Sequence, residues 1–339
     1  MRVVSLERSF GLENLKLRER DSRDPAPGEV RLRMRAASLN YRDLMMVRGH
    51  YNPSQPLPLI PCSDGVGVVE AVGDGVKRVG VGDRVCPIFA QGWIGGEPNY
   101  DKIRPTTLGG PLDGTLAEHM VVSAESVVKV PEYLEDLEAA TLPCAALTAW
   151  SALVSEGGVT AGDCVLVQGS GGVALFALQI ARALGARVIV TSSSDRKLER
   201  MRELGAEAAV NYRKTPKWGR AVRELSGGAG VDHVIEVGGA GTLAQSLSAV
   251  RIGGRISLIG VLSGNAASKL DITPIFMKNV RIQGLLVGSR DRFEAMCRAF
   301  EANEIQPLLD EQTFDLASAR DAFEHLASGE HFGKVALVI

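Results

Sequence analysis

Two different rhythms of hydrophobic and polar residues divide the chain. Near the N-terminus, short apolar runs with polar residues between them are interrupted by glycine, as in EVRLRMRAASL (29–39), DGVGVVEAVGDGV (64–76) and GVGDRVCPI (80–88). Runs of this kind, bounded by glycine, are typical of β-strands. The first 145 residues are therefore predicted to form an irregular, mostly antiparallel β domain.

From about residue 163 the pattern changes, and apolar strands alternate with helical stretches. The predicted elements are the strands 164–169, 187–193, 207–212, 231–239 and 254–261 and the helices 172–186 and 195–206. This alternation predicts a doubly wound parallel sheet with helices on both faces, an α/β fold. The first helix is apolar almost all round and is expected between the sheet and a second layer, whereas the charged second helix is expected at the surface.

The end of the chain is predicted to hold two amphipathic helices, starting in RDRFEAMCRAFEANEI (290–305), and a closing strand in GKVALVI (333–339). Before them, VRIQGLLVG (280–288) predicts the last strand of the parallel sheet. The expected divisions are residues 1–145, residues 146–288 and residues 289–339.

Composition and charge favour a small-molecule partner. The 339 residues include 38 basic and 40 acidic ones, a formal net charge of −2, without long blocks of one sign, which argues against binding nucleic acid or an anionic membrane. The five cysteines are scattered, with no CxxC pair, so neither a disulfide framework nor a four-cysteine zinc site is expected. Since no signal peptide or membrane-spanning run is evident, the protein is predicted to be cytoplasmic.

A glycine-rich turn follows the strand at 164–169 and opens the next helix. The segment contains Gly169, Gly171 and Gly172, and Val173 and Ala174 complete a GxGxxG/A pattern. Glycine allows the backbone to turn tightly and to approach a pyrophosphate, whose charge is then met by the helix N-terminus. Between a strand and a helix, the pattern predicts a dinucleotide site; the alternative is a glycine turn without a ligand.

The next strand lacks the acidic residue that usually binds an adenosine ribose about 20 residues after the first glycine of the motif. It ends in Ser192 and Ser193, and Arg196 and Lys197 follow. Serine hydroxyls can donate hydrogen bonds to a 2′-phosphate and a nearby cation can neutralise it, whereas a carboxylate would repel it. This pattern favours NADP(H) over NAD(H). The alternative is that the serines cap the following helix, because serine is a favoured N-cap residue.

Segments along nearly the whole chain resemble the medium-chain dehydrogenase/reductase superfamily of zinc alcohol dehydrogenases and quinone oxidoreductases. They are AASLNYRDLMMVRGHY, PLIPCSDGVGVVEAVGDGV, VGDRV, GTLAEHMVV, AATLPCAALTAWSAL, the glycine turn and HFGKVALVI. The resemblance implies a GroES-like β domain interrupted by a Rossmann domain, with the C-terminal segment returning to the first domain. It also implies a homodimer, in which the strand over 280–288 pairs with its copy in a second subunit.

The resemblance also bears on metal binding. Zinc-dependent members hold a catalytic metal with two cysteines and a histidine, and the matching places here are Asn40, Ser63 and Cys144. A catalytic zinc needs three suitable protein ligands, and one of the three survives. The structural zinc lobe is missing too, because residues 87–143 contain no cysteine. The chain is therefore predicted to bind no metal, with Cys144 as a small buried side chain.

Zinc-independent members imply roles for further residues. In them, the residue matching Asn40 lies against the nicotinamide half of the cofactor and the one matching Tyr51 lies at the substrate; these two are the predicted catalytic residues. Plain alternatives are a loop-fixing role for Asn40, a half-buried aromatic side chain for Tyr51 and an edge-strand charge for Lys334. Motif and resemblance together predict a cofactor site of Asn40, Thr148, Gly169, Gly171, Gly172, Val173, Ser192, Ser193, Lys197, Tyr212 and Lys334.

The expected chemistry follows from the lack of a metal. Hydride transfer from a nicotinamide leaves negative charge on the acceptor, which a metal, an acid or fixed donors must stabilise. A conjugated enone or a quinone is an easier acceptor than an isolated carbonyl, because hydrogen bonds can hold the oxygen that receives the charge, and Tyr51 is the expected donor. The prediction is an NADP(H)-dependent enone or quinone reductase. The alternatives are a zinc-free alcohol or aldehyde dehydrogenase and a non-catalytic NADPH-binding sensor.

Overall fold

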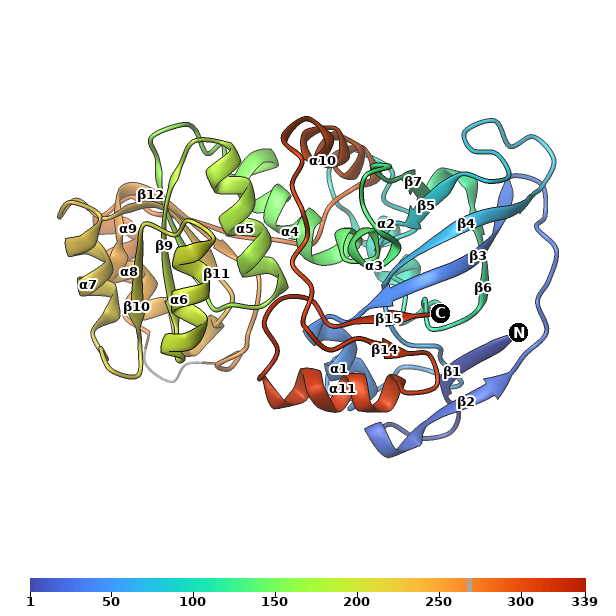
Figure 1. Ribbon diagram of the computed structural model, residues 1–339. Helices are drawn as coiled ribbons and strands as arrows, with labels where there is room; N and C mark the ends of the chain where they lie inside the picture. The colour runs from blue at the N-terminus through green and yellow to red at the C-terminus, as the bar shows by residue number, and fades with distance from the viewer. Residues whose placement is uncertain (267–269) are drawn as a thin grey trace. The chain divides into compact units, whose positions relative to one another are not determined.

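The computed structural model describes residues 1–266 and 270–339, which form two compact units (Figure 1). The first unit comprises Met1–Leu147 and Val287–Ile339, and the second comprises Thr148–Leu286. The chain therefore leaves the first unit, builds the second and returns. No helix within the described residues is both long and apolar enough to cross a membrane.

The second unit is built on a parallel six-stranded sheet with the order β10-β9-β8-β11-β12-β13. Its strands are β8 (Cys164–Gln168), β9 (Arg187–Ser192), β10 (Ala208–Asn211), β11 (Val231–Glu236), β12 (Val250–Leu258) and β13 (Arg281–Gly284). The strand order reverses between β8 and β11, since the chain runs outward from β8 to β10 and then crosses to the other side. The predicted doubly wound sheet is confirmed.

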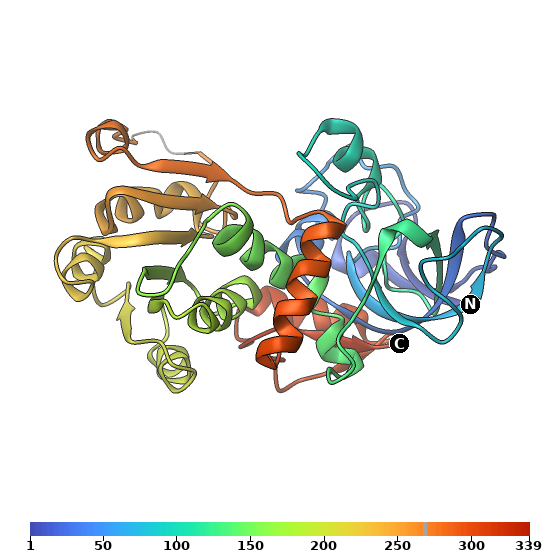
Figure 2. The ribbon, with the colours of Figure 1, turned by 90° about the horizontal axis from the view of Figure 1, so that it is seen from above.

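Helices cover this sheet on both faces (Figures 1 and 2). They are α5 (Gly172–Ala183), α6 (Asp195–Glu203), α7 (Trp218–Leu225), α8 (Leu243–Ala249) and α9 (Thr273–Met277). Right-handed crossovers place α5 and α6 on one face and α7 and α8 on the other. The apolar helix α5 is buried on most sides, whereas α6 buries Leu198 and Met201 and keeps its charges outside, as expected.

The first unit is a mostly antiparallel β domain. Its seven-stranded sheet has the order β14-β15-β3-β4-β5-β7, with β6 paired to β3, and β1 and β2 form a separate pair. The strands are β1 (Arg2–Leu6), β2 (Leu15–Glu19), β3 (Glu29–Ser38), β4 (Asp64–Val72), β5 (Arg84–Pro87), β6 (His119–Ser123), β7 (Val127–Lys129), β14 (Phe314–Asp315) and β15 (Ala336–Val338). The helices are α1 (Tyr41–Val47), α2 (Tyr100–Ile103), α3 (Asp136–Ala139), α10 (Arg290–Asn303) and α11 (Ala319–Ser328).

The C-terminal strand completes this first sheet. β15 pairs antiparallel with β3, so that Leu337 lies opposite Ala37 although the two are far apart in sequence. Both side chains are fully buried in the core beneath α11. The C-terminal segment thus pairs with the sheet of the first unit, and this brings Lys334 beside the end of β3.

Two strand boundaries differ from the sequence prediction by four residues each. β12 begins at Val250, four residues before the predicted start at 254, because its pairing with β11 continues through a register shift near Val231. Gly253 at the irregular stretch has a φ of 71°, which glycine adopts at little cost. β13 ends at Gly284, four residues before the predicted 288.

Candidate active site

The glycine turn of the second unit leaves its backbone open. Gly169, directly after β8, has a φ of 82°, in the left-handed region that favours glycine. Gly171 is the N-cap of α5, and a Cβ added to it would meet no described atom within 4 Å. No side chain of the described residues caps this helix end. A phosphate can therefore approach the amides of Gly172 and Val173 in the first turn of α5.

The predicted 2′-phosphate residues come from the ends of β9 and β10. Ser192 is 4% exposed at the end of β9, and its carbonyl oxygen accepts a hydrogen bond from the Tyr212 amide at 3.1 Å. Tyr212, just after β10, keeps 42% of its surface exposed. Lys197 lies in the first turn of α6. The two parallel strands thus bring Ser192, Ser193 and Tyr212 to one edge of the sheet.

A different serine caps the N-terminus of α6. Ser194 is the N-cap residue, and its Oγ accepts a hydrogen bond from the Lys197 amide at 3.4 Å. Ser192 Oγ accepts a local hydrogen bond from the Ser194 amide, also at 3.4 Å. The alternative that the serines cap the helix therefore applies mainly to Ser194, which lies outside the predicted cofactor site.

Sequence analysis missed a buried carboxylate in the second unit. Glu236, at the end of β11, is fully buried, and its carboxylate accepts hydrogen bonds from the amides of Gly238 (2.8 Å) and Gly239 (3.0 Å) and from Gln168 Nε2 (2.8 Å). It lies where the order of the strands reverses, the place at which open α/β sheets bind ligands. Glu236 thus fixes the turn after β11. The sequence could have indicated it, because an acidic residue ends the segment VDHVIE (231–236) inside a predicted strand.

In the first unit, Asn40 and Lys334 meet in a buried polar network. Lys334 Nζ donates hydrogen bonds to Asn40 Oδ1 at 2.6 Å and to the Leu39 carbonyl oxygen at 2.7 Å, and it lies 3.8 Å from Asp64 Oδ2. Lys334 is 3% exposed and Asp64 is fully buried. Desolvation raises the pKa of Asp64 to about 6, against the lowering effect of the Lys334 ammonium. Sequence analysis did not foresee Asp64 in this place.

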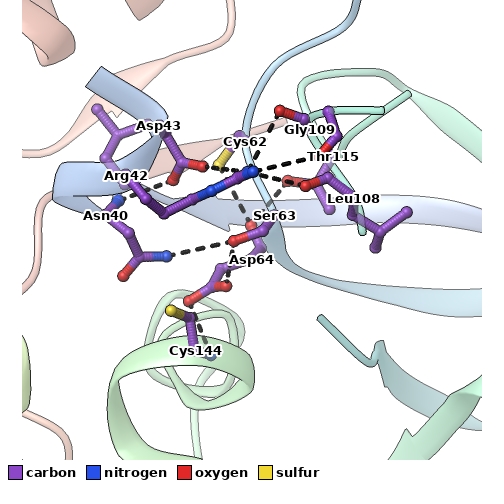
Figure 3. A network of polar contacts seen from close by, with 12 residues as sticks. Asn40, Arg42, Asp43, Cys62, Ser63, Asp64, Leu108, Gly109, Thr115 and Cys144 are labelled. Atoms are coloured by element: carbon purple, nitrogen blue, oxygen red, sulfur yellow. Dashed lines mark hydrogen bonds and ion pairs between the residues drawn. The ribbon is translucent and has the colours of Figure 1, made fainter. Parts of the chain in front are cut away.

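Ser63 and Cys144 complete the network, and Figure 3 shows them with Asn40 and Asp64. Ser63 lies between Asn40 and Asp64: its hydroxyl donates to Asp64 Oδ1 at 2.9 Å and accepts from Asn40 Nδ2 at 3.5 Å. The Cys144 amide, in the helical turn at Leu142–Ala146, donates to Asp64 Oδ2 at 3.2 Å. The three positions that the resemblance links to zinc thus lie around one carboxylate.

Tyr51 lies beside a second cluster of polar contacts, which is centred on Arg42. The Arg42 guanidinium carbon lies 5.0 Å from the centre of the Tyr51 ring, and its nitrogens donate to the carbonyl oxygens of Leu108 (2.8 Å) and Gly109 (3.2 Å). Asp43, fully buried, pairs with the same guanidinium at 3.1 Å. Tyr51 itself is 53% exposed.

The predicted residues therefore fall into separate groups. Asn40, Tyr51 and Lys334 belong to the first unit, and Asn40 and Lys334 are in direct contact. Thr148, at 4% exposure on α4 (Leu147–Trp150), begins the second unit, which also holds the glycine turn and the serines. Each unit thus offers a polar cluster of its own.

Two family descriptions match two stretches of the chain. Residues 26–132 match the alcohol dehydrogenase GroES-like domain, and residues 172–302 match the zinc-binding dehydrogenase family. A zinc-type alcohol dehydrogenase-like protein of Schizosaccharomyces pombe is 42% identical over 345 residues, covering 100% of this chain and 99% of that protein. Acryloyl-coenzyme A reductase of Sulfurisphaera tokodaii is 29% identical, covering 92% of this chain and 93% of its own.

Solved structures give the same picture. An NAD-dependent alcohol dehydrogenase is 34% identical with a TM-score of 0.91, covering 100% of both chains. A mycobacterial protein in complex with NADPH is 28% identical with a TM-score of 0.83, again covering 100% of both chains. Similar folds therefore occur with either nicotinamide cofactor.

Proposed function

This chain belongs to the medium-chain dehydrogenase/reductase superfamily, whose members are oxidoreductases acting on small molecules, and we propose that it is a zinc-independent, NADP(H)-dependent reductase of conjugated carbonyl compounds or quinones. The observation that carries the proposal is the set of donor atoms around Asp64, which Asn40, Ser63 and Cys144 contribute in place of a zinc-binding set. The protein is further proposed to act in the cytoplasm.

A catalytic zinc does not fit these residues. Zinc prefers thiolate, imidazole and carboxylate ligands, but Asn40 offers an amide and Ser63 a hydroxyl. Asn40 Oδ1 already accepts from the Lys334 ammonium, whose charge would repel a metal cation. Desolvation and the neighbouring Asp64 raise the pKa of the Cys144 thiol, which opposes the thiolate form. Across residues 1–266 and 270–339, no group of three or more His, Cys, Asp or Glu side chains is arranged to hold a metal ion.

A dinucleotide does fit the second unit. The open backbone at Gly171 and the uncapped first turn of α5 would hold the pyrophosphate, and Ser192, Ser193 and Lys197 would hold a 2′-phosphate. The lack of an acid at the end of β9 supports NADP(H), because a carboxylate there would repel the phosphate. When bound, the reduced nicotinamide supplies the hydride.

The proposed substrate class follows from the groups that can stabilise negative charge. The hydroxyl of the exposed Tyr51 and the amide of the half-buried Asn40 are neutral hydrogen-bond donors. Such donors suit an enolate or hydroquinone oxygen better than an isolated alkoxide, since conjugation spreads the charge. The likeness to an acryloyl-coenzyme A reductase supports this class, because an acryloyl group is a double bond conjugated with a carbonyl.

A zinc-free alcohol or aldehyde dehydrogenase is the second candidate. The likeness to an NAD-dependent alcohol dehydrogenase at 34% identity favours it. The same cofactor site and the same Tyr51 hydroxyl would serve this reaction, so substrate comparison separates the two candidates.

The metal prediction tests the proposal directly. Purified protein is expected to contain far less than one zinc per chain by elemental analysis and to keep its reductase activity in a chelator such as EDTA, because two of the three matching positions lack zinc-binding side chains. Stoichiometric zinc, or loss of activity in the chelator that added zinc restores, would contradict the proposal.

Assembly provides a second test. β13 lies at the edge of the parallel sheet, and nearby apolar side chains are exposed, with Phe276 at 67% and Leu286 at 51%. An exposed hydrophobic edge favours pairing with a second copy. Light scattering at micromolar concentration is expected to give a homodimer, twice the 36.1 kDa of one chain. The mass of a single chain would show that this edge stays unpaired.

A further inference from the structure

Lys334 buries a positive charge inside the first unit. With 3% of its surface exposed, its ammonium is held by the Asn40 side chain, by the Leu39 carbonyl oxygen and, at 3.8 Å, by the carboxylate of Asp64. Removing an ammonium from water is unfavourable unless partners replace the lost hydration. A simple edge-strand charge would lie outside in water, so the buried position calls for another explanation.

The ammonium determines which way the Asn40 amide faces. A lysine ammonium has donors and no acceptor, so Asn40 must turn its Oδ1 toward Lys334 and its Nδ2 away from it. On that other side, Nδ2 lies 3.5 Å from Ser63 Oγ, a long contact, and Asn40 is half-buried. One N–H of Nδ2 is thus directed at Ser63, and the amide of this half-buried residue has a second N–H to offer.

The remaining partners of this arrangement are held rigidly. Asp64 Oδ1 accepts from Ser63, and Oδ2 accepts from the Cys144 amide. Cys62, just before them, has a φ of 78°, an uncommon conformation for a side chain other than glycine, and it is fully buried. Gly114 packs so tightly there that a Cβ on it would lie 2.0 Å from the Cys62 carbonyl oxygen. Strained backbone of this kind persists where the surrounding structure holds it in place and is concentrated at functional sites.

We propose that Lys334 is a positioning residue for the reaction: its buried ammonium locks the Asn40 amide so that Nδ2 donates to the substrate oxygen on which negative charge develops. The ammonium also provides a fixed positive charge, which only the Asn40 side chain would separate from the substrate oxygen. A metal does not fit this site. This inference rests on the proposed function, because it assigns Asn40 to the reacting centre. The family resemblance implies that Lys334 lies near the cofactor pyrophosphate, and this proposal gives it a different role.

The test separates kcat from cofactor affinity. Lys334→Met removes the charge at similar length and is expected to lower kcat by about tenfold to a hundredfold, within the range for losing an oxyanion donor or its support. The Kd for NADPH, measured by fluorescence titration, is expected to change by less than about threefold. Lys129→Met is the matched control, because Lys129 is an exposed lysine of the same unit, and it is expected to leave both values unchanged.

A double-mutant cycle tests whether Lys334 acts through Asn40. Asn40→Ala is expected to lower kcat at least as much as Lys334→Met, and the double variant is expected to be no slower than Asn40→Ala, since the two changes remove the same interaction. If the double variant instead showed the product of the two single reductions in kcat, the two residues would act independently, and the inference would be overturned. A Lys334→Met variant with unchanged kcat and an NADPH Kd raised by tenfold or more would assign Lys334 to the pyrophosphate instead.

Asn40→Asp keeps the test decisive if Lys334→Met does not fold. This variant retains an acceptor for the ammonium and removes the Nδ2 donor. The new carboxylate near Asp64 is expected to lower the thermal midpoint, and kcat of the folded variant is expected to fall by at least about tenfold. Unchanged kcat would overturn the inference. All variants are compared on the best enone or quinone of the wild type; a wild type that reduces none of them overturns the proposed function and this inference together, whereas an active wild type with unaffected variants overturns this inference by itself.

Discussion

Replacement of Tyr51 with Phe is expected to lower kcat by about tenfold to a thousandfold, the range for losing one oxyanion donor or general acid. The ring stays beside Arg42, whose guanidinium carbon lies 5.0 Å from its centre, so packing is retained and the hydroxyl is removed. Because Tyr51 belongs to the first unit and the predicted phosphate-binding residues belong to the second, NADPH affinity is expected to change little.

Tyr41→Phe is the matched control for this experiment. Tyr41 is a partly exposed tyrosine of the same unit, at 43% exposure, and its replacement is expected to leave kcat unchanged. Steady-state kinetics under conditions where hydride transfer limits the rate would give both values. An unchanged kcat for Tyr51→Phe would assign the proton to solvent or to another residue.

Ser192→Asp is expected to reverse the cofactor preference. The wild type is expected to favour NADPH over NADH by at least about tenfold in kcat/KM, equal to ~1.4 kcal/mol, which a single charge-assisted hydrogen bond of about 1.5 to 3 kcal/mol can supply. An aspartate at the end of β9 would repel the 2′-phosphate and accept hydrogen bonds from the NADH ribose. The ratio of the two kcat/KM values is therefore expected to change by about a hundredfold or more.

Two further variants separate phosphate binding from helix capping. Lys197→Ala is expected to weaken NADPH and to leave NADH nearly unchanged, because its charge matters only to the 2′-phosphate. Ser194→Ala removes the N-cap of α6 and is expected to cost about 1 kcal/mol of folding stability without altering the cofactor ratio. The wild type could instead use both cofactors with equal kcat/KM, or Lys197→Ala could lower kcat/KM equally for NADPH and NADH. Either result would show that the serines only cap the helix.

The sequence predicted the fold well because the second unit repeats one simple pattern. Apolar strands alternate there with helices, of which the first is apolar and the second is charged. This pattern is compatible with few arrangements other than a doubly wound parallel sheet. The glycine turn was equally visible, because its glycines stand directly between a strand and a helix, and Gly169 has a φ of 82°, in the region that favours glycine. The start of β12 was missed because glycines at positions 253 and 254 read as a turn, whereas the strand passes through them with an irregular register.

The candidate cluster around Asp64 was only partly predictable. Asn40 and Lys334 were identified separately by resemblance, but they are 294 positions apart, and no local pattern indicates that they touch. Asp64 was not foreseen as their partner, because an acid at the start of a strand usually lies in solvent, and its burial follows from the packing of Ser63, Cys144 and the C-terminal strand around it. Such long-range contacts depend on the completed sheet, which brings β15 against β3.

Steady-state oxidation of NADPH by the wild-type protein, in the presence of a chelator and with a panel of quinones, enones, saturated aldehydes and alcohols, tests the central claim most directly. We predict turnover of a quinone or an enone, with kcat/KM at least about tenfold higher for NADPH than for NADH and higher for conjugated than for saturated acceptors. Binding of NADPH without turnover of any substrate, or activity confined to saturated alcohols and aldehydes, would contradict it.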